Sequence, residues 1–283
     1  MKKVAVITDS SAYLPEDIVQ SLDLHVVPLT LHWEEETYRD GVDIRAEEFY
    51  ERLAEADSLP TTSQTTVGEF ERLFKELLDQ DFAVIAILIS RGISGTVESA
   101  LQAKELFPDA PIAVVDSKLV SMALGFMVMA VARAAQDGAS LEECQAIAES
   151  VYPKIGVYFT VDTLKYLNKG GRINTAKRLL GAALNIKPIM EIRDGKIELV
   201  ESVRSRKKAS QRLLELTEKG IAGRAPVWIS TFHAAAEADN QALMAEAEAR
   251  FEPVETITTF VSPVVGTHTG PGTLSIAYMA GVD

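Results

Sequence analysis

Short continuous runs of apolar residues in the first half of the chain alternate with stretches of helical periodicity. The runs Val4–Thr8, Phe82–Ile89 and Ile112–Val115 are bounded by polar residues, as expected for strands covered on both faces. Helical patterns occupy residues 45–57, 67–79, 96–107 and 121–136. Strand and helix alternating at this spacing predict a parallel sheet with helices on both faces, which is a three-layer α/β domain.

The second half of the chain shows a different order of elements. Asp194-Gly195 separates the runs Pro188–Ile192 and Ile197–Val203, and this arrangement predicts a β-hairpin. Further strands are predicted at 157–160, 227–231 and 256–261, and helices at 207–219 and 234–250. We therefore expect a second α/β domain with a mixed sheet and helices mainly on one face. The boundary is placed near Pro153, which gives domains of residues 1–153 and 154–283.

Composition narrows the class of protein. The chain carries 41 acidic and 28 basic side chains, and the net charge of −13 would be repelled by nucleic-acid phosphates. Cys144 is the only cysteine, so an intrachain disulfide or a thiolate metal cluster is impossible, and no other pattern has metal-ligand spacing. The longest apolar run, Met122–Ala132, is too short to span a bilayer and predicts a buried helix. Without a recognisable targeting signal, we expect a cytoplasmic protein.

Four polar segments are expected near the ends of strands or helices, where they could line one cleft. These are Thr8–Ser11, Thr61–Gln64, Ser90–Thr96 and Gly266–Gly272. Ligands in doubly wound sheets bind outside the carboxyl ends of the strands, which is where the Asp9 and Ser94 loops are expected. Ser94 would also cap the helix that follows, and the free N–H groups of a helix start suit a carboxylate.

Each segment also has a purely structural interpretation. In this interpretation, the threonines before Val67 serve only to cap the next helix. Likewise, the glycines of residues 266–272 serve only to form a turn. This turn leads into an apolar helix, which is predicted at residues 273–279. Gly92-Ile93-Ser94-Gly95 begins like a nucleophile elbow, but Thr96 replaces the second glycine. A hydrolase would need a histidine base, for which His268 in its expected loop is the candidate, so this alternative stays open.

Taken together, the motifs resemble the DegV family along nearly the whole chain, from about Val4 to Tyr278. The motifs are Thr8–Ser11, Thr62–Gln64, Ile93–Thr96, Val115–Lys118 with Ser121-Met122, Leu164–Ile173, Asn185–Ile189, Arg204–Lys208 and Gly266–Gly272. Two positions depart from the family pattern. Thr65 stands where proline commonly follows Thr-Ser-Gln, which suggests a less rigid loop. Arg91 stands where a small residue is usual, and we expect its side chain to point into solvent.

The resemblance implies a fatty-acid-binding protein without catalytic activity of its own. A long-chain acid such as palmitate, stearate or oleate would lie in a buried tunnel between the two domains. Its carboxylate would accept hydrogen bonds from Thr62 and Ser94, near His268. The remaining ligand-binding candidates are Ser63, Gly95 and Thr96.

The resemblance also implies partners. Some family members present the bound acid to a separate ATP-dependent fatty acid kinase, and Arg172, Arg204 and Arg206 would then face that kinase. No cofactor beyond the bound acid is implied, and a transient contact with a membrane surface is compatible with loading. The family resembles dihydroxyacetone kinase subunits as well, which keeps a phosphoryl-transfer enzyme open as an alternative.

Overall fold

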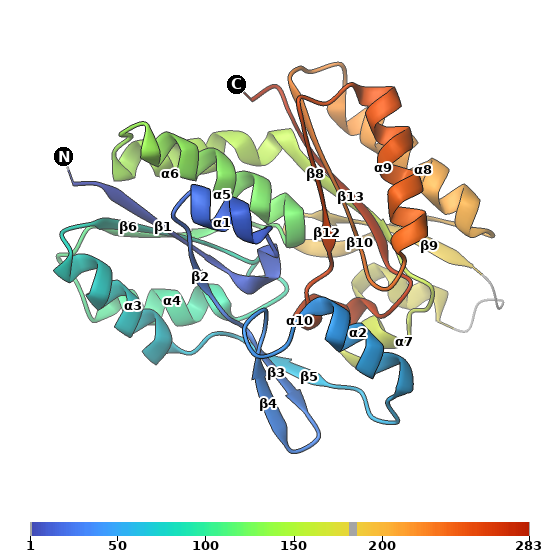
Figure 1. Ribbon diagram of the computed structural model, residues 1–283, viewed down its shortest axis with the longest axis horizontal. Coiled ribbons are helices and arrows are strands. Elements are labelled where there is room, and N and C mark those ends of the chain that lie inside the picture. Colours follow the sequence, from blue (N-terminus) through green and yellow to red (C-terminus); the bar gives the residue numbers. More distant parts are fainter. Residues whose placement is uncertain (1, 181–185, 283) are drawn as a thin grey trace.

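The computed structural model describes residues 2–180 and 186–282, which form an α/β protein with two large sheets and one small sheet (Figure 1). The first sheet is parallel throughout and has the strand order β2-β1-β6-β7. Its strands are β1 (Val4–Asp9), β2 (His25–Val27), β6 (Ala83–Leu88) and β7 (Ile112–Asp116). Helices α3 (Val67–Asp79) and α4 (Thr96–Glu105) cover one face, and α5 (Ser121–Gln136) and α6 (Leu141–Val151) cover the other. The predicted three-layer arrangement is confirmed.

The second sheet is mixed, as predicted, with the order β10-β9-β8-β13-β11-β12. Its strands are β8 (Ile155–Thr160), β9 (Lys187–Arg193), β10 (Lys196–Val203), β11 (Val227–His233), β12 (Glu255–Phe260) and β13 (Leu274–Ala280). Only β11 and β12 pair in parallel, and Asp194-Gly195 forms the expected hairpin turn between β9 and β10. The helices α8 (Arg206–Ile221) and α9 (Glu237–Phe251) pack on one face of this sheet.

The prediction of a helix over residues 273–279 is wrong, because β13 occupies this segment. The strand lies between β8 and β11 and is buried along its whole length, so its sequence is continuously apolar. Periodicity alone does not separate such a strand from a buried helix. A helix comes earlier instead: α10 (Pro263–Thr269) begins after the Ser262 cap with proline in its first turn. His268 therefore lies in the last turn of a helix, and its placement in a glycine-rich loop is corrected.

A small antiparallel sheet, which the sequence patterns did not indicate, carries one of the predicted polar segments. It contains β3 (Thr30–Trp33), β4 (Glu36–Arg39) and β5 (Thr61–Ser63) in the order β4-β3-β5. Thr62 therefore lies on a strand. The remaining elements are α1 (Glu16–Ser21), α2 (Ala46–Glu55), α7 (Lys165–Lys169) and the 3-10 turns η1 (Ser10–Ala12), η2 (Tyr152–Lys154) and η3 (Asn174–Leu179).

Helix α5 joins the two large sheets into one core. It is buried over most of its surface, as predicted, and packs against β1 and β6 on one side and β8 and β13 on the other. Phe126 meets the ring of Trp228 edge-on at 6.0 Å, and the Arg133 guanidinium lies 4.4 Å from the same ring. The division into domains at residue 153 stays a prediction. No helix in the described part of the chain is long and apolar enough to cross a membrane.

Candidate ligand-binding site

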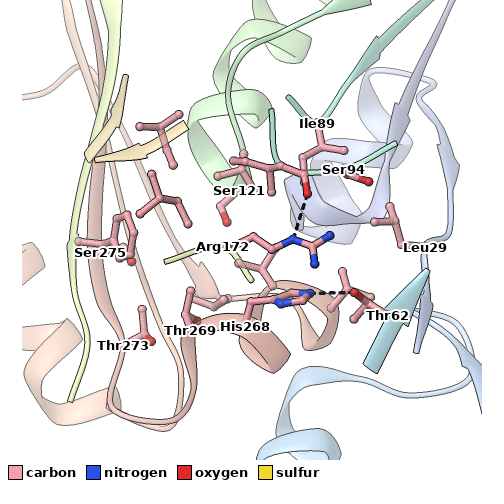
Figure 2. A pocket seen from close by; sticks show the side chains of 18 of the residues that line it. Leu29, Thr62, Ile89, Ser94, Ser121, Arg172, His268, Thr269, Thr273 and Ser275 are labelled. Atoms are coloured by element: carbon pink, nitrogen blue, oxygen red, sulfur yellow. Dashed lines mark hydrogen bonds between the residues drawn. The ribbon is translucent and has the colours of Figure 1, made fainter. Parts of the chain in front are cut away.

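A largely apolar cavity lies between the first sheet, the small sheet and the inner face of the second sheet (Figure 2). Its empty space, counted to the open mouth and including solvent there, is about 860 Å³. The apolar wall includes Ile89, Val157, Phe159, Ile192, Phe232 and Val264. The polar side chains in the wall come from β5 and the residue after it, the turns after β6 and α7, the first residue of α5, helix α10, and the start of β13 with the residue before it. A mostly apolar wall with a few polar groups suits an apolar ligand that carries a polar group.

Thr62 and His268 meet at this cavity, although they lie far apart in the sequence. Thr62 Oγ1 is 2.8 Å from His268 Nε2, a contact drawn in Figure 2. Thr61 is exposed and does not line the cavity, whereas Ser63 does. Burial, together with the nearby positive charge of Arg172, lowers the pKa of His268 to about 4. The imidazole is therefore neutral at pH 7, with one ring nitrogen able to donate and the other able to accept.

Ser94 reaches the same end of the cavity from the turn between β6 and α4. Its Oγ lies 2.9 Å from Thr96 Oγ1 and accepts the Thr96 N–H at 3.4 Å, while Gly95 occupies the N-cap position of α4. The residues Gly95 and Thr96 do not line the cavity. A Cβ on Gly95 would lie 2.7 Å from the Gln64 side chain, so glycine lets the β5 loop approach this turn closely. This approach brings the Thr62 and Ser94 segments together.

The two departures from the family pattern have clear environments. Thr65 is buried, and its hydroxyl donates to the Pro28 carbonyl at 2.9 Å, so a hydrogen bond ties the loop at this position. The following Thr66 caps α3, whereas Thr62 lines the cavity, so capping accounts for only part of this segment. Arg91 pairs with Glu98 on the surface, and the expectation that it points into solvent is confirmed.

The arginines predicted at a partner surface lie in different environments. Arg172 lines the cavity, where Nε donates to the Ile93 carbonyl at 3.2 Å and Nη1 to the Gly170 carbonyl at 2.6 Å. Among the described residues it has no ion-pair partner. Arg204 is exposed just before α8. By contrast, Arg206 is largely buried and pairs with Asp239 at 2.8 Å.

The serine-hydrolase arrangement is not assembled in the residues that the structure describes. There the Ser94 hydroxyl contacts Thr96, and no hydrogen bond joins it to His268. His268 Nδ1 is buried without a partner, whereas a catalytic triad needs an acidic group at that nitrogen. Within 2–180 and 186–282, no group of three or more histidine, cysteine or acidic side chains is arranged to hold a metal ion.

Sequence reasoning missed several hydroxyl groups in the cavity wall. They belong to Ser121, Thr269, Thr273 and Ser275. Ser121 has a φ of 53°, a left-handed conformation that is uncommon outside glycine, but nothing in its sequence context indicated this. Asn185, the first residue of one family motif, lies outside the described residues.

The lowered pKa of His268 makes stability depend on pH. Between pH 6.5 and about 4 the unfolded chain binds a proton at this side chain that the folded chain does not, so acidification destabilises the fold. We expect a contribution of up to about 3 kcal/mol to be lost across this window in the ligand-free protein. Urea unfolding at several pH values should show a weaker acid destabilisation for His268→Gln. Burial raises the pKa of Asp40 to about 7, so acidification stabilises the fold through this group. Asp40 is present in both proteins and does not affect the difference between them. Identical pH profiles for both proteins would contradict the assignment.

The chain is an α/β protein whose two large sheets and one small sheet surround a largely apolar cavity. A family model described as "Uncharacterised protein, DegV family" matches residues 3–281, and the chain belongs to this family. Protein DegV of Bacillus subtilis is 34% identical over 276 residues, covering 97% of this chain and 98% of that protein. The DegV domain-containing protein lmo2514 of Listeria monocytogenes is 36% identical over 278 residues, covering 98% of both chains.

Solved structures agree closely with this fold. A DegV family protein from Thermus thermophilus, described by its fatty acid binding, superposes with a TM-score of 0.93 at 32% identity, covering 98% of this chain and 99% of that one. The Bacillus subtilis DegV structure, described as a fatty acid binding protein, gives 0.90 at 34% identity over 99% and 100% of the two chains. A stearic acid-binding protein from Eubacterium ventriosum gives 0.91 at 28% identity over 100% and 99%.

Proposed function

We propose that this protein binds a long-chain fatty acid in the cavity between its two α/β halves and acts as a carrier. The observation that carries this proposal is that Thr62, Ser94, His268 and Arg172 all line one largely apolar cavity. The fatty-acid-binding descriptions of its structural relatives support the same ligand class. We also propose that the halves are two domains divided near Pro153.

The carboxylate of the acid would accept hydrogen bonds from Thr62 and Ser94. With its hydrogen on Nε2, the neutral His268 donates to Thr62 Oγ1, which leaves the threonine hydroxyl hydrogen free for the ligand. Nδ1 then carries only a lone pair, which is consistent with its lack of a partner. Arg172 places a positive charge beside the ligand carboxylate. This charge compensates the negative charge of the buried carboxylate.

The apolar wall supplies most of the affinity. Burial of about fourteen methylene groups at about 0.8 kcal/mol each gives on the order of 11 kcal/mol, before the costs of association and ordering. The polar end contributes less net energy, since charge-assisted hydrogen bonds of roughly 1.5–3 kcal/mol mainly offset desolvation of the carboxylate. This balance predicts slow release of the acid, as a carrier requires.

The partners follow from this chemistry. The bound acid would be presented to a separate ATP-dependent fatty acid kinase in the cytoplasm. The exposed Arg204 and the cavity arginine Arg172 are the proposed contacts, with Arg206 beside them at the start of α8. Loading would involve a transient contact with a membrane surface, and the net charge of −13 disfavours nucleic acid as a partner.

The proposal predicts that protein purified from a bacterial host carries a fatty acid. Mass spectrometry of a denatured extract should detect about one acyl chain per protein, and Thr62→Ala and Ser94→Ala should release it at least several-fold faster. Thr61→Ala is the matched control, because Thr61 neighbours Thr62 but does not line the cavity. Protein that is consistently empty and takes up neither palmitate nor oleate would contradict the proposal.

The enzymatic alternatives have a separate test. We expect the isolated chain to turn over neither ATP nor p-nitrophenyl esters, since Ser94 has no histidine base among the described residues. Ester turnover that Ser94→Ala abolishes would replace the carrier by a hydrolase.

A further inference from the structure

The Thr8–Ser11 motif takes no part in the proposed head-group site, yet its loop contains a deeply buried carboxyl group. Asp9 at the end of β1 is 0% exposed, and Asp40 in the turn after β4 is 1% exposed. Burial raises the pKa of Asp9, and it raises that of Asp40 to about 7. Neither carboxyl has a basic side chain within ion-pair distance in the described part of the chain. Retaining two such groups costs stability and therefore calls for a specific role.

Asp9 connects β1 to the wall of the acyl cavity. Its Oδ2 accepts the backbone N–H of Ile89 at 2.6 Å, and Ile89 lines the cavity. The other oxygen, Oδ1, accepts the N–H and the hydroxyl of Ser11 at 3.0 Å and 2.5 Å, which fixes the orientation of the carboxyl. Ile89, the residue directly after β6, is thus held in place by a carboxyl group outside the cavity.

Asp40 makes the corresponding connection to two further parts of the wall. Its Oδ2 accepts the Ser10 hydroxyl at 2.6 Å, and Ser10 Oγ in turn accepts the N–H of Leu29 at 3.0 Å. Its Oδ1 accepts the N–H of Val264 at 3.4 Å, in the first turn of the helix that carries His268. Leu29 and Val264 both line the cavity, and Figure 2 shows Leu29 facing it opposite the second sheet.

Packing alone is poorly suited to hold this part of the wall. Asp9, Ser10 and Asp40 also line a second, more open cavity, whose empty space is about 1080 Å³ counted to its mouth. Although these three side chains are almost fully buried, the second cavity interrupts the close packing on one side of them. Hydrogen bonds to backbone N–H groups are directional and hold their partners without such packing.

We propose that Asp9 and Asp40 are positioning residues for the acyl site: Asp9 holds the backbone N–H of Ile89, and Asp40 holds that of Val264 directly and that of Leu29 through the Ser10 hydroxyl. The three wall residues come from three separate segments, Leu29, Ile89 and Val264, so the two carboxyls fix these segments relative to one another. The inference rests on the proposed function, because the site being shaped is the acyl site. Loss of either carboxylate loosens the wall and speeds release of the acid.

The test compares Asp9→Asn and Asp40→Asn with the control Asp116→Asn. Asp116 also ends a strand of the first sheet and also accepts backbone N–H groups, from Arg91 and Lys118, but neither of these lines the cavity. Transfer of radiolabelled palmitate to albumin, measured well below each variant's melting temperature, should become tenfold faster or more for the two test variants and stay unchanged for the control. A merely structural role lowers the melting temperature and leaves transfer from the folded protein unchanged, which would overturn the proposal.

Backbone hydrogen exchange on the lipid-free proteins gives a readout that does not depend on the ligand. We expect faster exchange in peptides covering Ile89 for Asp9→Asn, and in peptides covering Val264 for Asp40→Asn. Ser10→Ala, which removes only the acceptor of the Leu29 N–H and the donor to Asp40, serves if either carboxyl variant does not fold. If exchange changes as expected while the wild-type protein binds no palmitate, the proposed function fails and the positioning network stands. Unchanged exchange at all three segments overturns the network.

Discussion

Replacing Phe126 by alanine is expected to lower the free energy of unfolding of the lipid-free protein by about 3–5 kcal/mol, the usual cost of removing a buried phenylalanine. Phe126 is fully buried on α5, and its ring packs edge-on against Trp228 of the second sheet. The truncation therefore leaves a cavity at the place where the two halves share one core. For a chain of this size, the melting temperature should fall by about 10 °C.

Urea unfolding followed by tryptophan fluorescence also tests whether the halves unfold together. The chain has two tryptophans, Trp33 in the small sheet and Trp228 in the second sheet. The variants Trp33→Phe and Trp228→Phe therefore each leave one reporter, in the second and the first half respectively. With a shared core, Phe126→Ala shifts both reporters to the same lower midpoint. Leu101→Ala, at a partly exposed position on α4, is the control with little expected effect. A shift confined to one reporter would mean that the halves unfold independently.

The sequence predicted the first half of the fold well because its signals are local. Helix α3 begins at Val67 after a Thr66 capping box, and its bounds and those of α5 match the predicted ranges. The small sheet was missed because its strands are only three or four residues long and partly polar. The helix predicted in place of β13 has a different cause. A strand that is buried on both faces does not alternate between apolar and polar residues, so its sequence does not distinguish it from a buried helix.

Sequence patterns alone identified a residue of the site only where a polar motif directly follows a predicted apolar strand. Ser94 follows a clear apolar strand and lies in the cavity wall, whereas Thr62 rested on the family resemblance. The contact between Thr62 and His268 joins residues 206 positions apart, so no local spacing indicates it. Arg172 was assigned to a partner surface because its sequence neighbours do not show that it lines the cavity. The positions of these side chains depend on packing between segments that are far apart in the sequence. Local sequence patterns contain no information about such packing.

Replacing Gly170 by alanine is expected to speed release of the bound acid tenfold or more while leaving the fold intact. Gly170 ends α7 with φ −77° and ψ −6°, a conformation that alanine adopts without strain. However, an added Cβ would lie 2.1 Å from His268 Nδ1, so the imidazole must move away. That movement breaks the contact with Thr62 and removes the group that orients its hydroxyl. Palmitate transfer to albumin measures the effect, and Gly68→Ala in α3, where a Cβ meets nothing within 4 Å, is the control.

A double-mutant cycle decides whether Gly170→Ala acts through the imidazole. His268→Ala alone should speed release to a similar degree, because it also leaves Thr62 without its orienting partner. In the His268→Ala background there is no ring for the new methyl group to displace, so adding Gly170→Ala should change the release rate little further. The two effects would then be strongly non-additive. Additive effects would instead mean that the methyl group perturbs the cavity directly, for example through Arg172, which donates to the Gly170 carbonyl at 2.6 Å.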